Sequence, residues 1–187
     1  MSEQTVQSKN SSSLENAQAT AEAWIKTEGG GAYWPPEMIG NKLAEELGEI
    51  TEELLRFHDP KAYGDYSAKN LGLELGDAIF AVVCMANSHK IGLQGAFQTS
   101  PAGGSSKSLL ELAALLTLEV GKVTKDVLRL HGPKKKDKFN PNDLETHLRG
   151  VASAIVSIAS SQSIDLDQAW GETLEKYNIR DAGRWTK

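Results

Sequence analysis

Two acidic units have a spacing that could serve metal-assisted chemistry: Glu46-x-x-Glu49 and Glu74-x-x-Asp77. Residues three apart share a helix face, so each unit presents two carboxylates side by side. Two such helices packed together would bring four carboxylates to one spot, where they repel one another unless a cation lies among them. Ligation by carboxylates alone favours a hard ion such as Mg²⁺, with Mn²⁺ as the other ion that fits. The spacing therefore predicts a magnesium enzyme that acts on phosphates.

The chain contains an internal repeat, and its second copy can be used to test whether the acids are needed for the fold. A shift of 73 residues aligns 43–97 with 116–170 without a gap, and 18 of the 55 aligned positions are identical. The second copy keeps the hydrophobic pattern but only one acid of the four, so the acids are not needed to build the fold. They are predicted to do chemistry in the first copy. At the same four positions the second copy carries Glu119, Lys122, His147 and Gly150.

The neighbouring polar residues divide into two groups. Arg56 and His58 recur in the second copy and are predicted to be structural, whereas Glu45, Glu52 and Glu53 are assigned to a solvated helix face. Asp77 opens a helix that becomes apolar on all sides, where an unpaired carboxylate would cost several kcal/mol. It is therefore protonated, paired with a cation or bound to a metal. Because three other acids are in reach, metal binding is the preferred interpretation.

Apolar residues recur at steps of three and four throughout, and no alternation of period two is found. The sequence predicts an all-α fold, a helical bundle with a four-helix core made of two fused helical-hairpin repeats. Gly92 to Ser106 reads as a flexible linker. Helices are expected from Ser12 or Ser13 to about Lys26, from Pro36 to near His58, from Lys69 to Lys90, and at about 107–131, 142–163 and 166–178.

Composition narrows the classes of function. The net charge of −5 argues against a nucleic-acid binder, which needs a basic face. The single cysteine, Cys84, excludes an intrachain disulfide, and the apolar run from Ala78 to Ala86 is too short to cross a membrane. No apolar signal core is found near the N-terminus, so a cytoplasmic location is expected. The two fused repeats within one chain resemble a dimer, and whether two chains also pair into a homodimer stays open.

The acidic units resemble the MazG-type, all-α nucleotide pyrophosphohydrolases, whose signature is an ExxE unit, a spacer and an ExxD unit. The resemblance extends to Ala32-Tyr33-Trp34-Pro35-Pro36, to 83–88, and to a C-terminal tail, Glu175-Lys176-Tyr177-Asn178-x-Arg180-Asp181-x-x-Arg184-Trp185. In single-domain members this tail follows the ExxD helix directly, whereas here it follows the second copy. The second half is therefore expected to bring the tail over the metal site of the first. The implied division is a disordered tail (1–15), a catalytic half (16–97), a linker (98–106) and a degenerate repeat with a nucleotide-contacting tail (107–187).

The resemblance implies hydrolysis of a nucleoside triphosphate between the α and β phosphates. Glu46, Glu49, Glu74 and Asp77 would hold Mg²⁺, and either Glu46 or Glu49 would activate water. Phosphate contacts are implied for Lys176, Arg180 and Arg184, and a base or sugar contact for Asn178. Trp34 either stacks on the base or packs at the start of a helix, and Lys134 to Lys136 reads as a solvated loop. The alternatives are an enzyme of the same fold acting on phosphoribosyl-ATP or dUTP, and a non-catalytic helical module that binds a nucleotide or a partner protein.

Overall fold

The computed structural model describes residues 13–98, 106–133 and 140–181, and within these ranges every regular element is a helix. The predicted all-α class is confirmed. The elements are η1 (Leu14–Asn16), α2 (Ala17–Thr27), α3 (Pro36–His58), α4 (Pro60–Tyr63), α5 (Ala68–Ser88), α6 (Leu109–His131), α7 (Pro141–Ser161) and α8 (Leu166–Asp181).

Local signals explain where the long helices begin. Pro36 occupies the first turn of α3, where a missing N–H costs nothing. The Ser67 hydroxyl accepts a hydrogen bond from the Asn70 N–H at the start of α5. At α6, Ser108 and Glu111 form a reciprocal capping box. The short helix α4 is not among the expected helices; it is capped by Asp59 and lies between α3 and α5 in the chain.

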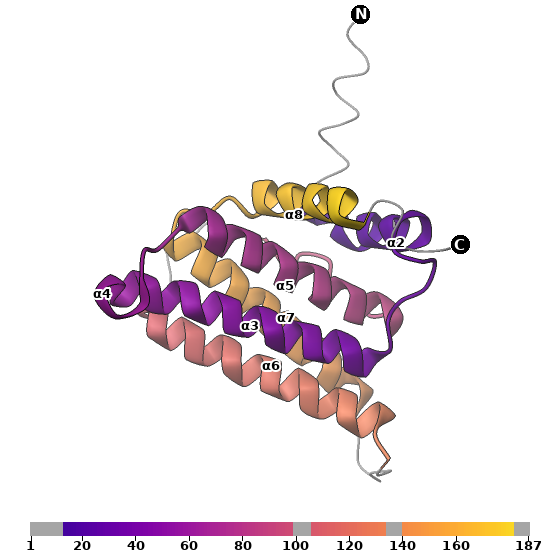
Figure 1. Ribbon diagram of the computed structural model, residues 1–187. Helices are drawn as coiled ribbons and strands as arrows, with labels where there is room; N and C mark the ends of the chain where they lie inside the picture. Colours follow the sequence, from indigo (N-terminus) through magenta and orange to yellow (C-terminus); the bar gives the residue numbers. More distant parts are fainter. Residues whose placement is uncertain (1–12, 99–105, 134–139, 182–187) are drawn as a thin grey trace, which may run out of the picture.

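Helices α3, α5, α6 and α7 form the four-helix core, and α2 and α8 lie across the exposed side of α5 (Figure 1). An aromatic cluster fixes this outer layer on the core. Phe80 of α5 packs 5.4 Å from Trp24 of α2 and 4.9 Å from Tyr177 of α8, measured between ring centroids. Trp170 of α8 is fully buried beside the same phenylalanine. The tail helix is thereby held against the helix that carries Glu74 and Asp77.

The helix bounds follow the repeat offset of the sequence. Helices α3 and α6 each have 23 residues, α5 and α7 each have 21, and both pairs begin 73 positions apart. The division into two halves, which this agreement supports, stays a prediction. Residues 14–16 form the short helix η1, and α8 continues to Asp181, three residues beyond the expected end of that helix. Residues 1–12 and 99–105 lie outside the described residues.

Helix α5 is the most buried element. By length and composition it could cross a membrane, but 78% of its most apolar stretch of 18 residues is buried inside the protein. Within the described residues it is the one helix that passes that test. The burial is that of a central core helix, which a soluble bundle also contains.

Candidate functional site

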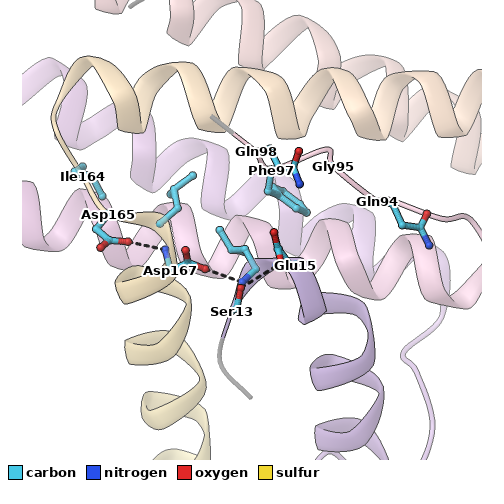
Figure 2. A pocket seen from close by; sticks show the side chains of 11 residues that line it. Ser13, Glu15, Gln94, Gly95, Phe97, Gln98, Ile164, Asp165 and Asp167 are labelled. Atoms are coloured by element: carbon cyan, nitrogen blue, oxygen red, sulfur yellow. Dashed lines mark hydrogen bonds between the residues drawn. The ribbon is translucent and has the colours of Figure 1, made fainter. Parts of the chain in front are cut away.

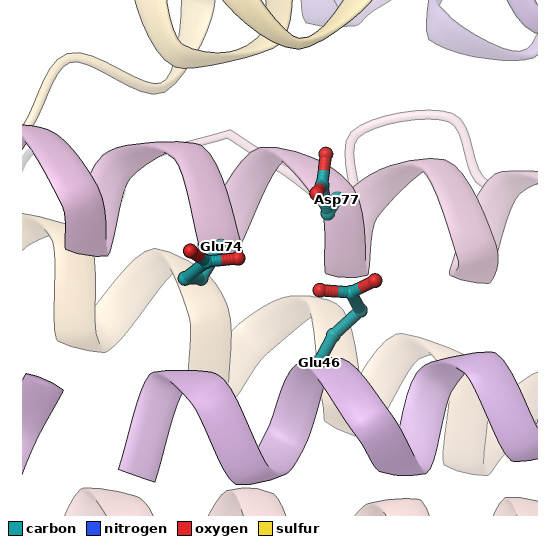
Figure 3. Close-up of side chains that lie close together, drawn as sticks. All are labelled: Glu46, Glu74 and Asp77. Carbon is teal, nitrogen blue, oxygen red and sulfur yellow. The ribbon is translucent and has the colours of Figure 1, made fainter. Parts of the chain in front are cut away.

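Three of the four predicted acids converge between α3 and α5. Glu46 points from α3 toward α5, which carries Glu74 and Asp77 (Figure 3). One carboxylate oxygen from each of the three residues lies within 4.8 Å of the other two. Glu46 is 0% exposed and Asp77 is 5% exposed, while Glu74 is partly buried. The acid-x-x-acid spacing therefore does place carboxylates from two helices at one spot.

The crowding perturbs the titration of two glutamates. Burial, with the charge of Asp77 added, raises the pKa of Glu46 to about 8, although Lys42 opposes the shift. Burial raises the pKa of Glu74 to about 7, and hydrogen bonding to Glu49 contributes. Glu49, the fourth predicted acid, is exposed and lies at the rim of the cluster beside Glu74. Raised carboxylate pKa values show that the site favours a positive charge, which a proton or a metal ion can supply.

Two lysines neutralise part of the cluster. The Lys42 ammonium lies 2.6 Å from Glu46 Oε1, and the Lys176 ammonium of α8 forms an ion pair with Asp77 Oδ2. Glu46 Oε2 and Asp77 Oδ1 remain, both buried and without a hydrogen-bond partner within the described part of the chain. Buried oxygens without partners are costly, and oxygen donors are what Mg²⁺ and Mn²⁺ prefer. The donor set fits such an ion.

The tail helix reaches the cluster because it packs unusually close to α5. At Gly76, an added Cβ would lie 3.0 Å from the Ala169 carbonyl oxygen and 2.2 Å from the Thr173 hydroxyl oxygen of α8. Tyr177 is buried on the same side, where burial and the charge of Asp77 raise the pKa of its hydroxyl. The second half thus supplies Lys176 to the first half's acids, which is the placement that the tail's position predicted.

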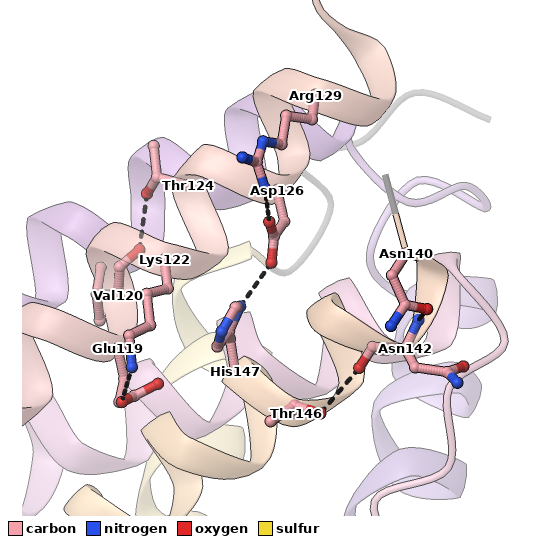
Figure 4. A network of polar contacts seen from close by, with 10 residues as sticks. All are labelled: Glu119, Val120, Lys122, Thr124, Asp126, Arg129, Asn140, Asn142, Thr146 and His147. Carbon is pink, nitrogen blue, oxygen red and sulfur yellow. Dashed lines mark hydrogen bonds and ion pairs between the residues drawn. The ribbon is translucent and has the colours of Figure 1, made fainter. Parts of the chain in front are cut away.

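The second copy has a different set of contacts at the equivalent positions (Figure 4). Lys122, in the place of Glu49, has its ammonium 2.7 Å from Glu119 Oε1. The Glu119 carboxylate lies against Gly150, whose added Cβ would meet Glu119 Oε2 at 2.6 Å. Since Gly150 stands where the first copy has Asp77, the glutamate occupies space that an aspartate would need. In the second copy, the positive charge beside the glutamate is therefore that of a lysine side chain.

Trp34 is half-buried and lines a small cavity beside the cluster. The cavity has a volume of about 270 Å³ and is also lined by Met38, Asn41, Lys42 and Glu45. Lys42 lines this cavity and forms an ion pair with Glu46, so it connects the cavity to the acidic cluster.

The other tail residues have partners within the protein. Asn178 Oδ1 accepts a hydrogen bond from the Trp24 indole N–H at 2.8 Å. The Arg180 guanidinium donates to both carboxylate oxygens of Asp181, at 2.9 and 2.7 Å, and lies 4.7 Å from the Tyr177 ring centroid. Arg184 and Lys134 to Lys136 lie outside the described residues.

The assignment of Glu53 to a solvated face was wrong. Glu53 is 3% exposed, forms an ion pair with Arg56, and accepts a hydrogen bond from the Ser67 N–H at 3.2 Å. Its counterpart Asp126 is 1% exposed and pairs with Arg129 and His147. An acid kept in both copies, three residues before a kept arginine, was the signal available in the sequence. Lys42 was also missed, since a lysine four residues before a glutamate is common on helix surfaces.

A larger cavity, of about 640 Å³, lies away from the acidic cluster (Figure 2). It is formed by η1, the segment before residue 99 and the start of α8, and its lining includes Glu15, Asp165 and Asp167. The Leu14 N–H donates to Asp167 Oδ1 there, at 2.7 Å. No lysine or arginine lines the described part of this cavity. An acidic lining without cations does not suit a polyphosphate.

Comparison with known proteins identifies the family. The family described as the MazG nucleotide pyrophosphohydrolase domain matches residues 35–102. The uncharacterized protein YpjD of Bacillus subtilis (strain 168) is 33% identical over 81 residues, which cover 43% of this chain and 73% of that protein. No solved structure matches. The chain belongs to the MazG nucleotide pyrophosphohydrolase family, and the matched region contains all four acids of the first copy.

Proposed function

We propose that the chain is a Mg²⁺-dependent nucleoside triphosphate pyrophosphohydrolase. It would cleave between the α and β phosphates and release a nucleoside monophosphate and pyrophosphate. The observation that carries this proposal is the convergence of Glu46, Glu74 and Asp77 within 4.8 Å, in a chain of this family, with buried oxygens left without partners.

The four acids take different roles according to their burial. Glu46, Glu74 and Asp77 are the inner ligands for Mg²⁺ or Mn²⁺, because their oxygens already converge. The bound ion would offset the charge that develops on the phosphates during hydrolysis. Glu49 is exposed at the rim, where the attacking water must enter, so we assign to it the orientation and deprotonation of that water.

The substrate would be held by groups that flank the acids. Lys42 and Lys176 each carry a positive charge at the edge of the cluster, and both are partly exposed. With substrate and ion bound, we expect the two ammonium groups to exchange carboxylate oxygens for phosphate oxygens. The cavity beside Trp34 and Met38 would take the base, since an aromatic ring offers a stacking surface for a purine or pyrimidine.

The tail residues beyond Lys176 would support this arrangement. Asn178 and Arg180 already have partners on the protein, so a direct contact with nucleotide requires them to exchange these. The contact between Asn178 and Trp24 favours a supporting role for Asn178, in which it joins α8 to α2. The contacts of Arg180 with Asp181 and Tyr177 lie within α8.

The test is pyrophosphate release from a panel of nucleoside triphosphates with Mg²⁺, Mn²⁺ or EDTA. The repeat offers a matched pair of variants, because Glu46 and Glu119 occupy equivalent positions. Glu46→Gln should lose activity by at least about 100-fold, in line with the loss of a ligand oxygen at a metal centre, whereas Glu119→Gln should retain it. Saturable nucleotide binding without release, in folded wild-type protein with Mg²⁺, would mean a binding module and refute the proposal.

A further inference from the structure

The outer face of α6 is mostly apolar, although the opposite face of the same helix already packs into the core. Leu110, Leu118 and Leu128 are 45%, 55% and 56% exposed, and Leu112, Leu116 and Val123 on the inner face are buried. Six exposed residues lie within an arc of about 80° at 3.6 residues per turn. Surface helices normally carry polar residues on that side. The six residues, defined here as the α6 stripe, are Leu110, Ala114, Leu118, Gly121, Lys125 and Leu128.

The first copy again serves as a control. Helix α3 carries Glu37, Asn41, Glu45 and Glu52 at the positions equivalent to Leu110, Ala114, Leu118 and Lys125. The half that keeps the acids therefore has a polar outer face, while the half that lost them has leucines instead of glutamates. Since α3 has glutamates at the positions equivalent to Leu110 and Leu118, these two leucines are not needed to build a hairpin. Gly121 and Leu128 are the same residues in both copies. An exposed apolar row of this kind marks a surface for a partner.

The stripe is complementary to itself in shape. It alternates large and small residues, and Gly121 near its middle has no atom within 4 Å of an added Cβ. When two copies of α6 pack antiparallel about a two-fold axis between positions 118 and 121, Leu118 of each copy faces Gly121 of the other. The same axis brings Leu110 of one copy close to Leu128 of the other, because the midpoint of these two positions lies about half a residue from it.

The charges along α6 favour the same antiparallel direction. Glu111 lies exposed in the first turn, whereas Lys125 lies exposed in the second half of the helix. In the antiparallel arrangement Lys125 of one copy lies within about one turn of Glu111 of the other. A parallel pair would instead bring like charges together and align the two helix dipoles.

We infer that the α6 stripe is an interface for a second copy of this chain, formed as an antiparallel α6–α6 contact. Helix α6 lies at the edge of the bundle, where it packs mainly against α3 and α7 (Figure 1). A contact along one helix of about 34 Å buries an area at the low end of specific interfaces. The dimer is therefore expected to be reversible, with a dissociation constant in the micromolar range. This inference does not depend on the proposed function.

The test is sedimentation equilibrium from about 1 to about 200 μM, a range that brackets the affinity of a small interface. The wild-type chain should show a monomer–dimer equilibrium. Leu118→Glu, which copies the residue of α3, should shift the dissociation constant upward at least about 10-fold without lowering the melting temperature. Gly121→Leu should weaken the dimer as well, while its higher helix propensity keeps the monomer at least as stable.

The antiparallel register is tested by disulfide formation between two variants. A mixture of Leu118→Cys and Gly121→Cys should give a mixed disulfide dimer faster than either variant alone, because the two positions face each other only across the two-fold axis. The native Cys84 is buried and should stay reduced. A chain that is monomeric up to the highest concentration, or a dimer that Leu118→Glu leaves intact, would overturn the inference.

Discussion

Replacing Gly76 by alanine is expected to push α8 away from α5, whereas the same change at Gly72, one turn earlier, is expected to be harmless. An added Cβ at Gly76 would lie 2.2 Å from Thr173 Oγ1, 3.2 Å from Thr173 Cβ and 3.0 Å from the Ala169 carbonyl oxygen. At Gly72 the nearest atom is Ile164 Cγ2 at 3.5 Å, an ordinary contact. Both glycines lie inside α5, so both variants gain the same helix propensity.

The pair of variants separates steric contact from propensity. Thr173 is fully buried and one close atom belongs to the backbone, so the contact at Gly76 can be relieved only by a shift of α8. Overpacking of this kind costs about 1–3 kcal/mol, while glycine to alanine in a helix gains about 1 kcal/mol. Gly72→Ala should therefore stabilise by up to about 1 kcal/mol, and Gly76→Ala should be less stable than Gly72→Ala by about 1–3 kcal/mol.

The assay is thermal unfolding of the two variants and the wild type in the same buffer. For a chain of this size, 1 kcal/mol shifts the melting temperature by about 2–4 °C, so a central difference of 2 kcal/mol gives about 4–8 °C. The shift of α8 should also separate Lys176 from Asp77, so Gly76→Ala should raise KM for the substrate and Gly72→Ala should not. A Gly76→Ala variant as stable as Gly72→Ala would refute the close packing and the reasoning built on it.

Three further predictions use the buried charges. The pKa of Glu46 is raised to about 8 in the folded state, so the folded protein holds a proton that the unfolded chain releases above about pH 4.5. The melting temperature in EDTA should therefore fall as the pH rises from 5 to 8. Adding Mg²⁺ should raise the melting temperature more at pH 8 than at pH 6. A flat profile in EDTA would contradict this. Arg56→Ala leaves Glu53 buried without its ion-pair partner and should lower the free energy of unfolding in urea by about 2–3 kcal/mol. An unchanged free energy of unfolding would contradict the structural role of this ion pair. Lys122→Met should cost about 1 kcal/mol, because the ammonium that neutralises Glu119 is itself partly exposed, and it should leave pyrophosphate release unchanged.

The sequence predicted the long helices well because their signals are local. Apolar periodicity, the proline at the start of α3 and the serine before α6 are readable without knowledge of the fold. The pairing of two helical hairpins was readable for another reason, since a repeat cannot bury its apolar face alone. The short helix α4 was missed because four residues carry no periodicity.

The candidate metal site could be predicted only in part from the sequence. The acid-x-x-acid spacing pointed to four residues, and the second copy lacks the equivalents of Glu49, Glu74 and Asp77 but keeps that of Glu46. The structure brings Glu46, Glu74 and Asp77 together. The burial of Glu53 depends on the start of α5, 14 residues later in the chain, and helix spacing alone does not report that contact. The contact between Asn178 and Trp24 was out of reach for the same reason, because 154 residues separate the two.

The most direct test of the central claim is identification of the products by ³¹P NMR, with a nucleoside triphosphate and Mg²⁺ incubated with the wild-type chain. We expect a nucleoside monophosphate and pyrophosphate in equal amounts, and no reaction in EDTA. A nucleoside diphosphate with inorganic phosphate, or monophosphate release that EDTA leaves unchanged, would contradict the assignment of Glu46, Glu49, Glu74 and Asp77 to metal-dependent cleavage between the α and β phosphates.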